Sequence, residues 1–201
     1  MSNSRYVLPQ FEEKTTYGTR TIDPYSKLFQ ERIVFLASPI DSVSSNDIMS
    51  QLLILNHIDD SSPIRLYINS PGGEFEDMTA IYDTMKFISA PVHTLCLGKA
   101  EGVAAILLAA GEKGSRILLP NAKVVLYQPV SYNGGRGQAS DITIEANEIV
   151  RTRNWIEKTL SSITGHPEEQ IKQDIEREFH LTAEKAVEYG LADALAAQGS
   201  N

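Results

Sequence analysis

The amino-acid sequence predicts an α/β domain, and three observations support this fold class. Short apolar runs such as 64–68 and 92–97 alternate with longer segments whose apolar residues recur every three or four positions. Turn-forming residues stand between them, as in Asn69-Ser70-Pro71-Gly72-Gly73. The 201 residues, 42% of them hydrophobic, suffice for one domain with a substantial core, and no linker, low-complexity segment or repeat suggests a second. Alternating strands and helices place the chain in the α/β class.

The first half of the chain alternates strand and helix after a polar N-terminal segment. Residues 1–23 are polar with scattered aromatics, so we expect a flexible arm. Asp23-Pro24 opens a short helix that ends near Glu31. Ser44, with Asp47 three residues later, predicts the cap of the next helix. The elements predicted after the short helix are a strand at 32–36, the helix through Ile48, Leu52, Leu55 and Ile58, a strand at 64–68, a helix at 76–88 and a strand at 92–97.

The second half continues the alternation and contains one long helix. The predicted elements are a buried helix after Gly102, strands at 116–119 and 123–127, the long helix at about 141–163, a short helix at 168–175 and a last helix capped by Thr182 and stopped by Gly190. The glycine-rich segment 131–140 breaks the pattern before the long helix. One roughly apolar stripe on the long helix consists of Ile142, Ala146, Ile149, Arg153, Ile156 and Leu160. Because a projecting arm with such a stripe needs a partner, we hypothesise a self-association surface there.

Composition excludes several classes of function. The net charge of −8 argues against non-specific binding to nucleic acid or to an anionic membrane. The single Cys96 lies in an apolar run, so we expect a buried, inert thiol and a reduced compartment. No motif places a metal beside it, and we expect neither metal nor cofactor. The longest apolar stretch, 103–110, is too short to span a bilayer, and the N-terminus has no apolar signal core. We therefore expect a cytoplasmic protein.

The segment 98–111 has the pattern of a strand end, a tight turn and a buried helix. Such a turn suits a catalytic nucleophile, because it holds one residue above the sheet beside the amide groups of the helix start. Here that residue is Gly102, and no hydroxyl or thiol occurs from Glu101 to Val103. The scaffold looks like that of a serine peptidase from which the nucleophile is missing.

Seven motifs in order carry a resemblance to a known family over residues 5–196. They are YINSPGG (67–73), IYDTM (81–85), LLAAG (107–111), LPNAKV (119–124), QP (128–129), GQASDI (137–142) and TAEKAVEYGLAD (182–193). Together they resemble the proteolytic subunit of the ATP-dependent Clp protease, the ClpP family. The openings RYVLPQF and DPYSKLFQERI are most similar to one of the paralogous ClpP types of actinobacteria.

The resemblance implies an architecture. The head is a spiral of β-β-α units, as in ClpP and the crotonases, and a handle of extended chain plus long helix projects from it. We therefore expect an arm at 1–23 and one domain at 24–201, with its head at 24–130 and 164–196 and its handle at 131–163. The family also implies two stacked heptameric rings around a chamber, with AAA+ unfoldases docking on the outer faces. The partners expected are the chain itself, active ClpP paralogs and an unfoldase.

The resemblance also locates a Ser-His-Asp triad, and this chain departs from it at all three positions. Gly102 stands at the serine position, Tyr127 at the histidine position before Gln-Pro, and Glu178 at the aspartate position. Glutamate can orient a histidine in place of aspartate. Glycine cannot accept an acyl group, and a tyrosine with an ordinary pKa of about 10 keeps its proton at neutral pH. We expect this chain to lack the Clp serine chemistry.

The oxyanion elements are better preserved. In the family, the turn containing Gly72 and Gly73 and the amide after the serine, here Val103, form the oxyanion hole. Two successive glycines allow a close approach of backbone amides to a ligand. The alternative is that this turn is kept because the fold requires it.

Two further surfaces follow from the resemblance. The unfoldase-docking pocket corresponds to Tyr67, Phe87, Leu95, Ile117 and Leu195. Arg65 stands where that pocket is often aromatic, which weakens the case for docking, and the alternative is that these are ordinary core residues. The ring-to-ring contact corresponds to Gly134, Gly135, Gly137, Asp141, Glu176 and Arg177. A solvated charge cluster around Arg177 is the alternative there.

Three functions compete. The leading hypothesis is a non-catalytic ClpP-family subunit that assembles with itself or with active paralogs and changes assembly, docking or activity. The second is an active endopeptidase with an unrecognised nucleophile, with Ser70, Ser115 and Ser131 as the nearest candidates. The third is a crotonase-like module that binds an acyl ligand.

Overall fold

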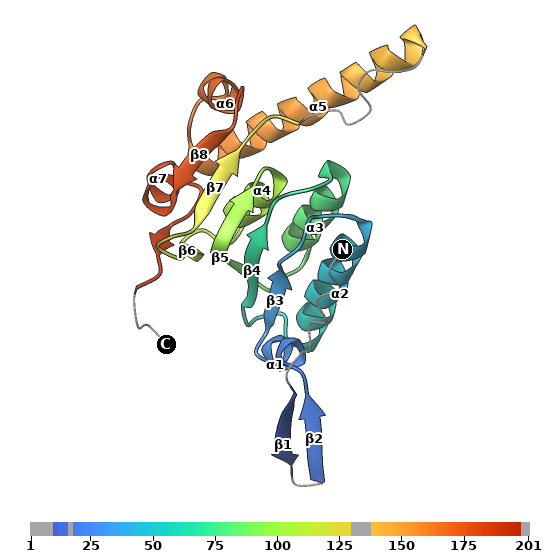
Figure 1. Cartoon of the computed structure of the whole chain (residues 1–201), viewed down its shortest axis with the longest axis vertical. Helices are drawn as coiled ribbons and strands as arrows, with labels where there is room; N and C mark the ends of the chain where they lie inside the picture. Colours follow the sequence, from blue (N-terminus) through green and yellow to red (C-terminus); the bar gives the residue numbers. More distant parts are fainter. Residues whose placement is uncertain (1–9, 16–17, 130–137, 198–201) are drawn as a thin grey trace, which may run out of the picture.

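A parallel sheet forms the centre of the molecule, as the alternation of elements predicted (Figure 1). The computed structural model describes residues 10–15, 18–129 and 138–197. The parallel strands, in spatial order, are β3 (Ile33–Leu36), β4 (Ile64–Ser70), β5 (Val92–Glu101), β6 (Arg116–Leu118) and β9 (Ala194–Leu195).

The long strand β5 belongs to two parts of the sheet. Its first half pairs with β6 through Thr94 to Cys96, and its last three residues pair with β7 (Lys123–Leu126). Strand β7 in turn pairs antiparallel with β8 (Phe179–Thr182). The pairing of β4 with β5 shifts register between Ile68 and Ser70. The sheet therefore turns along β5, in agreement with the predicted α/β spiral.

The described residues form seven helices, most of which cover one face of the sheet (Figure 1). They are α1 (Pro24–Gln30), α2 (Ser42–Ile58), α3 (Phe75–Phe87), α4 (Val103–Ala109), α5 (Ala139–Thr164), α6 (Glu168–Asp174) and α7 (Ala183–Glu188). Alternate residues of β4, namely Ile64, Leu66 and Ile68, are fully buried, and every residue of α4 is buried with them. Burial of each large aliphatic side chain contributes about 1.5–3 kcal/mol, so this face is the core of the fold.

Helix α2 begins earlier than the sequence predicted. Its N-cap is Asp41, whose carboxylate accepts from the amides of Val43 (3.1 Å) and Ser44 (2.8 Å). The Ser44 hydroxyl accepts from the Asp41 amide at 2.9 Å. Ser44 is thus the N3 residue of a capping box and not the cap, and the prediction was wrong because a serine can close the box in place of the usual Glu or Gln.

The segment predicted as an arm contains a hairpin. Strands β1 (Phe11–Thr15) and β2 (Gly18–Ile22) pair antiparallel, with Phe11 opposite Ile22, and the hairpin extends away from the sheet (Figure 1). The sequence analysis predicted no strand here, because FEEKT lacks an alternation of apolar and polar residues. Whether the arm is flexible stays a prediction.

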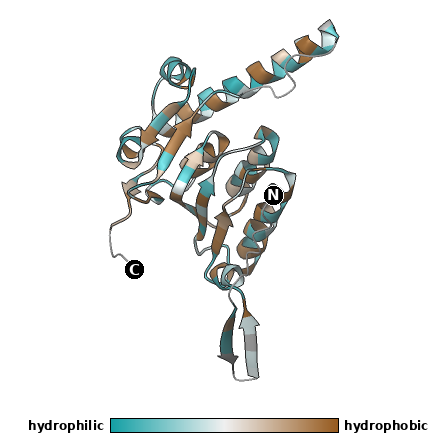
Figure 2. Ribbon diagram, viewed as in Figure 1, coloured by the Kyte–Doolittle hydropathy of each residue, from teal (hydrophilic) through white to brown (hydrophobic). Residues whose placement is uncertain are grey.

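Helix α5, which spans 26 residues, projects from the head (Figure 1). Its C-terminal half is anchored, since Ile156 and Leu160 are buried in the core and Trp155 stacks edge-on against Phe75 and Tyr82. Its N-terminal half carries exposed apolar residues between polar ones, visible as alternating colours in Figure 2. The predicted stripe therefore has two environments, one in the core and one facing outward.

Candidate functional site

The strand-to-helix turn predicted around Gly102 is present. Strand β5 ends at Glu101 and α4 begins at Val103, with Gly102 as the N-cap residue at φ 53° and ψ −119°. This backbone conformation is sparsely populated by residues with a side chain. The Gly102 amide donates to the Val125 carbonyl at 2.8 Å, which fixes the turn against β7.

The phenol of Tyr127 lies directly against Gly102. A Cβ atom built on Gly102 would be 2.8 Å from Tyr127 Cε2 and closer still to its Cζ and Oη atoms. Contacts below 3.0 Å are essentially never made by real Cβ atoms. The Tyr127 hydroxyl donates weakly to the Pro71 carbonyl at 3.5 Å. The tyrosine therefore occupies the space that a side chain on residue 102 would require.

The turn with Gly72 and Gly73 is needed by the fold. The Ile40 amide donates to the Gly72 carbonyl at 2.8 Å, and the Glu74 amide donates to the Ile40 carbonyl at 2.9 Å. A Cβ on Gly73 would lie 2.6 Å from the Ile40 amide nitrogen, and its φ of +154° is unusual for other residues. The Gly72 amide donates to the Ser70 hydroxyl at 3.2 Å. These contacts support the structural alternative for the two glycines, although Gly73 and Val103 also line the cleft described below.

Glu178 lies beside Tyr127 in the strand register but bonds elsewhere. Leu126 pairs with Phe179, so the residue after β7 and the residue before β8 meet at the end of the same ladder. The Glu178 carboxylate is 3.1 Å from Nε2 of His180, and both side chains are largely exposed. Glu178 therefore has a histidine partner outside the cleft.

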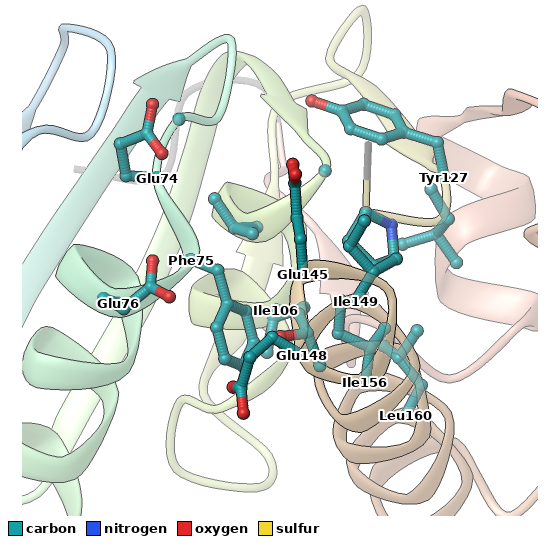
Figure 3. A pocket seen from close by; sticks show the side chains of 16 residues that line it. Glu74, Phe75, Glu76, Ile106, Tyr127, Glu145, Glu148, Ile149, Ile156 and Leu160 are labelled. Carbon is teal, nitrogen blue, oxygen red and sulfur yellow. The ribbon is translucent and has the colours of Figure 1, made fainter. Parts of the chain in front are cut away.

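A cleft of about 180 Å³ opens between the Gly102 turn, α3 and α5 (Figure 3). Its floor is apolar and its rim carries carboxylates. The lining residues are Gly73, Glu74, Phe75, Glu76, Gly102, Val103, Ile106, Leu126, Tyr127, Pro129, Glu145, Glu148, Ile149, Thr152, Ile156 and Leu160. Tyr127 stands at one end of the cleft, with its hydroxyl directed toward the side from which Glu74 comes. Among the described residues that line the cleft there is no serine, cysteine, histidine, lysine or arginine.

The serines named as substitute nucleophiles do not line this cleft. Ser70 is buried, and its hydroxyl donates to the Ser38 carbonyl at 2.7 Å. Ser115 precedes β6, away from the Gly102 turn. Ser131 lies outside the described residues. Among the described residues that line the cleft, Thr152 is the one hydroxyl residue besides Tyr127, and it is a buried residue of α5 that the sequence analysis did not single out.

Three of the five residues assigned to a docking pocket form one row on the sheet face opposite the helices. Tyr67 pairs with Leu95, and Leu95 pairs with Ile117 across β4, β5 and β6. Phe87, at the end of α3, is 83% exposed, whereas Leu195 pairs with the buried Leu118 and so lies in a different row. Arg65 pairs with His93, two residues before Tyr67 and Leu95 on the same strands, and so lies on the same open face. Basic side chains therefore stand beside the apolar row.

The residues assigned to the ring contact are distributed unevenly. Gly134, Gly135 and Gly137 lie outside the described residues. Asp141 is exposed in the first turn of α5. Arg177 is exposed and makes no ion pair within the part of the chain that the structure describes.

Glu176 belongs to a hydrogen-bonded cluster centred on Arg153. The Arg153 guanidinium donates to Glu157 (2.7 Å), to Glu176 (3.1 Å) and to the side-chain oxygen of Gln128 (2.9 Å). The hydrogen bond to Glu157 raises the pKa of Arg153 above its ordinary value. The sequence analysis placed Arg153 in an apolar stripe, and the signal it missed was the acidic partner Glu157 one turn later.

Metal and membrane chemistry find no support in the described residues. No group of three or more His, Cys, Asp or Glu side chains there could hold a metal ion. Burial raises the pKa of the Cys96 thiol to about 12, so the thiol stays protonated at neutral pH. Within the same residues, no helix combines the length and apolarity needed to cross a membrane.

Comparison with known proteins identifies the family. The family described as Clp protease matches residues 16–199. The chain is 51% identical over 193 residues to ATP-dependent Clp protease proteolytic subunit 1 of Tropheryma whipplei strain Twist, covering 96% of this chain and 93% of that protein. It is 52% identical over 194 residues to proteolytic subunit 2 of Streptomyces coelicolor (96% and 88%) and 51% identical over 193 residues to proteolytic subunit 1 of Corynebacterium diphtheriae (96% and 92%). The chain belongs to the Clp protease family.

Proposed function

We propose that this chain is a non-catalytic subunit of a Clp protease. The observation that carries the proposal is the Gly102–Tyr127 contact, in which a glycine and a tyrosine stand at the positions that the family resemblance assigns to nucleophile and base. Loss of the nucleophile alone reduces kcat of a serine peptidase by roughly 10⁶. A tyrosine with its proton in place cannot replace the histidine as a base. The related proteins are named proteolytic subunits, so the proposed role is structural or regulatory within such an assembly.

In this role the chain assembles into stacked heptameric rings, formed either by copies of itself or together with active paralogs. The projecting half of α5, with Ile142, Ile144 and Val150 exposed, supports a contact between rings, as does the exposed Arg177. The row of Tyr67, Leu95 and Ile117 on the open face of the sheet supports docking of an AAA+ unfoldase on the outer face, and the exposed Phe87 at the end of α3 is a second apolar contact point. The basic residues Arg65 and His93 beside this row would alter which unfoldase binds. We place the assembly in the cytoplasm.

The test compares the pure chain with a mixture. The chain, purified to homogeneity, is assayed with fluorogenic peptides, with an unfolded protein and with a serine-reactive fluorophosphonate probe. No turnover and no labelling are expected, because the described cleft contains no serine or cysteine. Native mass spectrometry with an active paralog is expected to yield mixed rings. Robust turnover with labelling of the pure chain would instead favour an active peptidase, and tight binding of an acyl-CoA would favour the crotonase-like alternative.

A further inference from the structure

We infer that Tyr127 is a built-in occupant of the cleft, which closes the end where a peptide carbonyl would otherwise sit. The inference rests on the proposed function, because it explains how a site without a nucleophile is also kept closed. Its starting point is the overlap between the phenol and the space above Gly102. Two features therefore require glycine at position 102: the Tyr127 ring leaves no room for a Cβ atom, and the backbone φ of 53° disfavours other residues.

The hydroxyl of Tyr127 covers the neighbouring turn. It is 3.5 Å from the Pro71 carbonyl, and a Cβ built on Gly72 would lie 3.1 Å from it. The phenol thus bridges from the Gly102 turn to the turn with Gly72 and Gly73, the two backbone segments that would have to hold an oxyanion between them. A group that fills this gap leaves no room for a substrate carbonyl.

The backbone beside Tyr127 is fixed from two sides. The Gln128 amide donates to the Ile175 carbonyl at 3.0 Å, and the Gln128 side chain donates to the Glu176 carbonyl at 3.2 Å. Arg153 holds the Gln128 side-chain oxygen at 2.9 Å. On the other side, β7 pairs with β5 up to Val125 and with β8 up to Leu126. The tyrosine is therefore held at the cleft by secondary structure and by this cluster together.

The consequence is that positions 102 and 127 form a coupled pair. The remaining cleft can accept a side chain on its apolar floor of Phe75, Ile106 and Ile156, but a peptide backbone cannot reach the Gly102 turn. Removing the ring should open that end of the cleft, and adding a side chain at 102 should be tolerated only when the ring is gone.

The first test is a double-mutant cycle on thermal stability, measured at one protein concentration with the oligomeric state checked. Gly102→Ala should lower Tm by at least about 3 °C more in the wild-type background than in Tyr127→Ala, since that shift corresponds to a coupling of ordinary size for residues in contact. The backbone strain that alanine incurs at this positive φ is the same in both backgrounds, so it cancels in the difference between the two Tm losses. In a Tyr127→Phe background, the excess loss should persist, because the ring remains.

The matched control is Gly114→Ala. Gly114 also has a positive φ, of +92°, but no atom lies within 4 Å of its added Cβ, so its cost should be the same in every background. Equal costs for Gly102→Ala in the wild-type and Tyr127→Ala backgrounds would overturn the inference.

A second test does not require a folded Gly102 variant. Fluorescence anisotropy with a labelled, leucine-rich pentapeptide should show binding to Tyr127→Ala about tenfold tighter than to the wild type, with Tyr127→Phe like the wild type. Equal affinity of wild type and Tyr127→Ala would contradict the closed cleft. If either test fails, the cleft is not closed by Tyr127, but the proposed non-catalytic role still stands because the nucleophile is absent. Turnover by the pure chain would overturn the proposed function, and it would not change the result of the double-mutant cycle.

Discussion

At the scale of single residues, the positions Gly102, Tyr127 and Glu178 were singled out from motifs, but their interactions were not predicted. Gly102 and Tyr127 are 25 positions apart in the sequence, and only the pairing of β7 with β5 brings them into contact. The hydrogen bond of Glu178 to His180 was also missed, since two exposed side chains two residues apart carry no signal beyond adjacency. Residue identity predicts which chemistry is missing, and only the fold shows what fills the space.

Restoration of the triad should be strongly non-additive. Gly102→Ser alone is expected to give almost no hydrolysis, because its side chain meets the Tyr127 ring and finds no base. Gly102→Ser with Tyr127→His should give a rate at least about 10²-fold higher than either single variant, since triad members act as a unit. The rate is followed with a fluorogenic peptide, and fluorophosphonate labelling checks that Ser at 102 reacts.

His180 offers a refinement of this experiment. The added histidine at 127 needs the Glu178 carboxylate, which is 3.1 Å from His180. His180→Gln in the doubly restored chain should therefore raise the rate further, while His166→Gln, which leaves Glu178 untouched, should not. Full activity in the single serine variant would show that another base serves the site.

A second residue-scale prediction concerns the buried ion pair of Asp193 and Arg116. Asp193 accepts from the Gly114 amide and from both the amide and the guanidinium of Arg116, and these bonds hold its pKa near 2. Because the pKa is lower in the folded state, the stabilisation is fully present above the unfolded value of about 3.9 and is lost as pH falls toward 2. Asp193→Asn should lower the free energy of unfolding by about 2–4 kcal/mol at pH 7.

Denaturant titrations at pH 7 and at pH 3 measure this effect. The difference between wild type and Asp193→Asn should shrink at the lower pH, and the exposed Asp83→Asn serves as the control with little change at either pH. A cost for Asp193→Asn that is the same at both pH values would contradict the pKa argument.

At the scale of elements, the predicted helices and the predicted strands at 32–36, 64–68, 92–97, 116–119 and 123–127 are present, whereas four short strands were not predicted. The predicted long helix at 141–163 corresponds to α5 at Ala139–Thr164, because 3.6-residue periodicity extends over many turns. Strands β8 and β9 have four and two residues, so each is defined by its partner across the sheet and not by its own sequence. The hairpin of β1 and β2 was missed for the same physical reason.

The Arg153 cluster gives a testable prediction at this scale. Arg153 joins α5 to the residue after Tyr127 and to the residue before Arg177, and its side chain is mostly buried. Arg153→Gln should lower the free energy of unfolding by about 1–3 kcal/mol and increase hydrogen exchange around 126–129 and 174–178. Arg151→Gln is the matched control, because its pair with Glu148 on the same helix is exposed and should contribute less than about 1 kcal/mol. Equal costs for the two variants would show that the cluster does not hold these segments.

At the scale of the whole molecule, the projecting half of α5 makes an isolated subunit improbable. Exposed apolar residues on a helix without a covering layer favour association. We predict a ring oligomer of about seven or fourteen subunits, consistent with closed cyclic symmetry. Arg177→Ala should shift the sedimentation coefficient toward single rings, since Arg177 is a free cation on the described surface, while Lys172→Ala on the neighbouring helix α6 should not. A stable monomer at micromolar concentration would contradict the predicted ring oligomer. Unchanged assembly of Arg177→Ala would contradict the predicted role of Arg177 between rings.

The pairing of the late strands β8 and β9 with strands formed much earlier in the chain has a consequence for folding during synthesis on the ribosome. Ile117 of β6 pairs with Ala194, and Lys123 of β7 pairs with Thr182, so the sheet is completed only by residues 179–195. Pairings this distant in sequence close slowly, because the entropy of the intervening loop must be lost first. Until residues 179–195 have left the exit tunnel, β6 lacks its parallel partner β9 and β7 lacks its antiparallel partner β8. A nascent chain is therefore open to chaperones and to wrong strand partners until these residues have emerged, and truncation before residue 190 should yield aggregates instead of a smaller folded subunit.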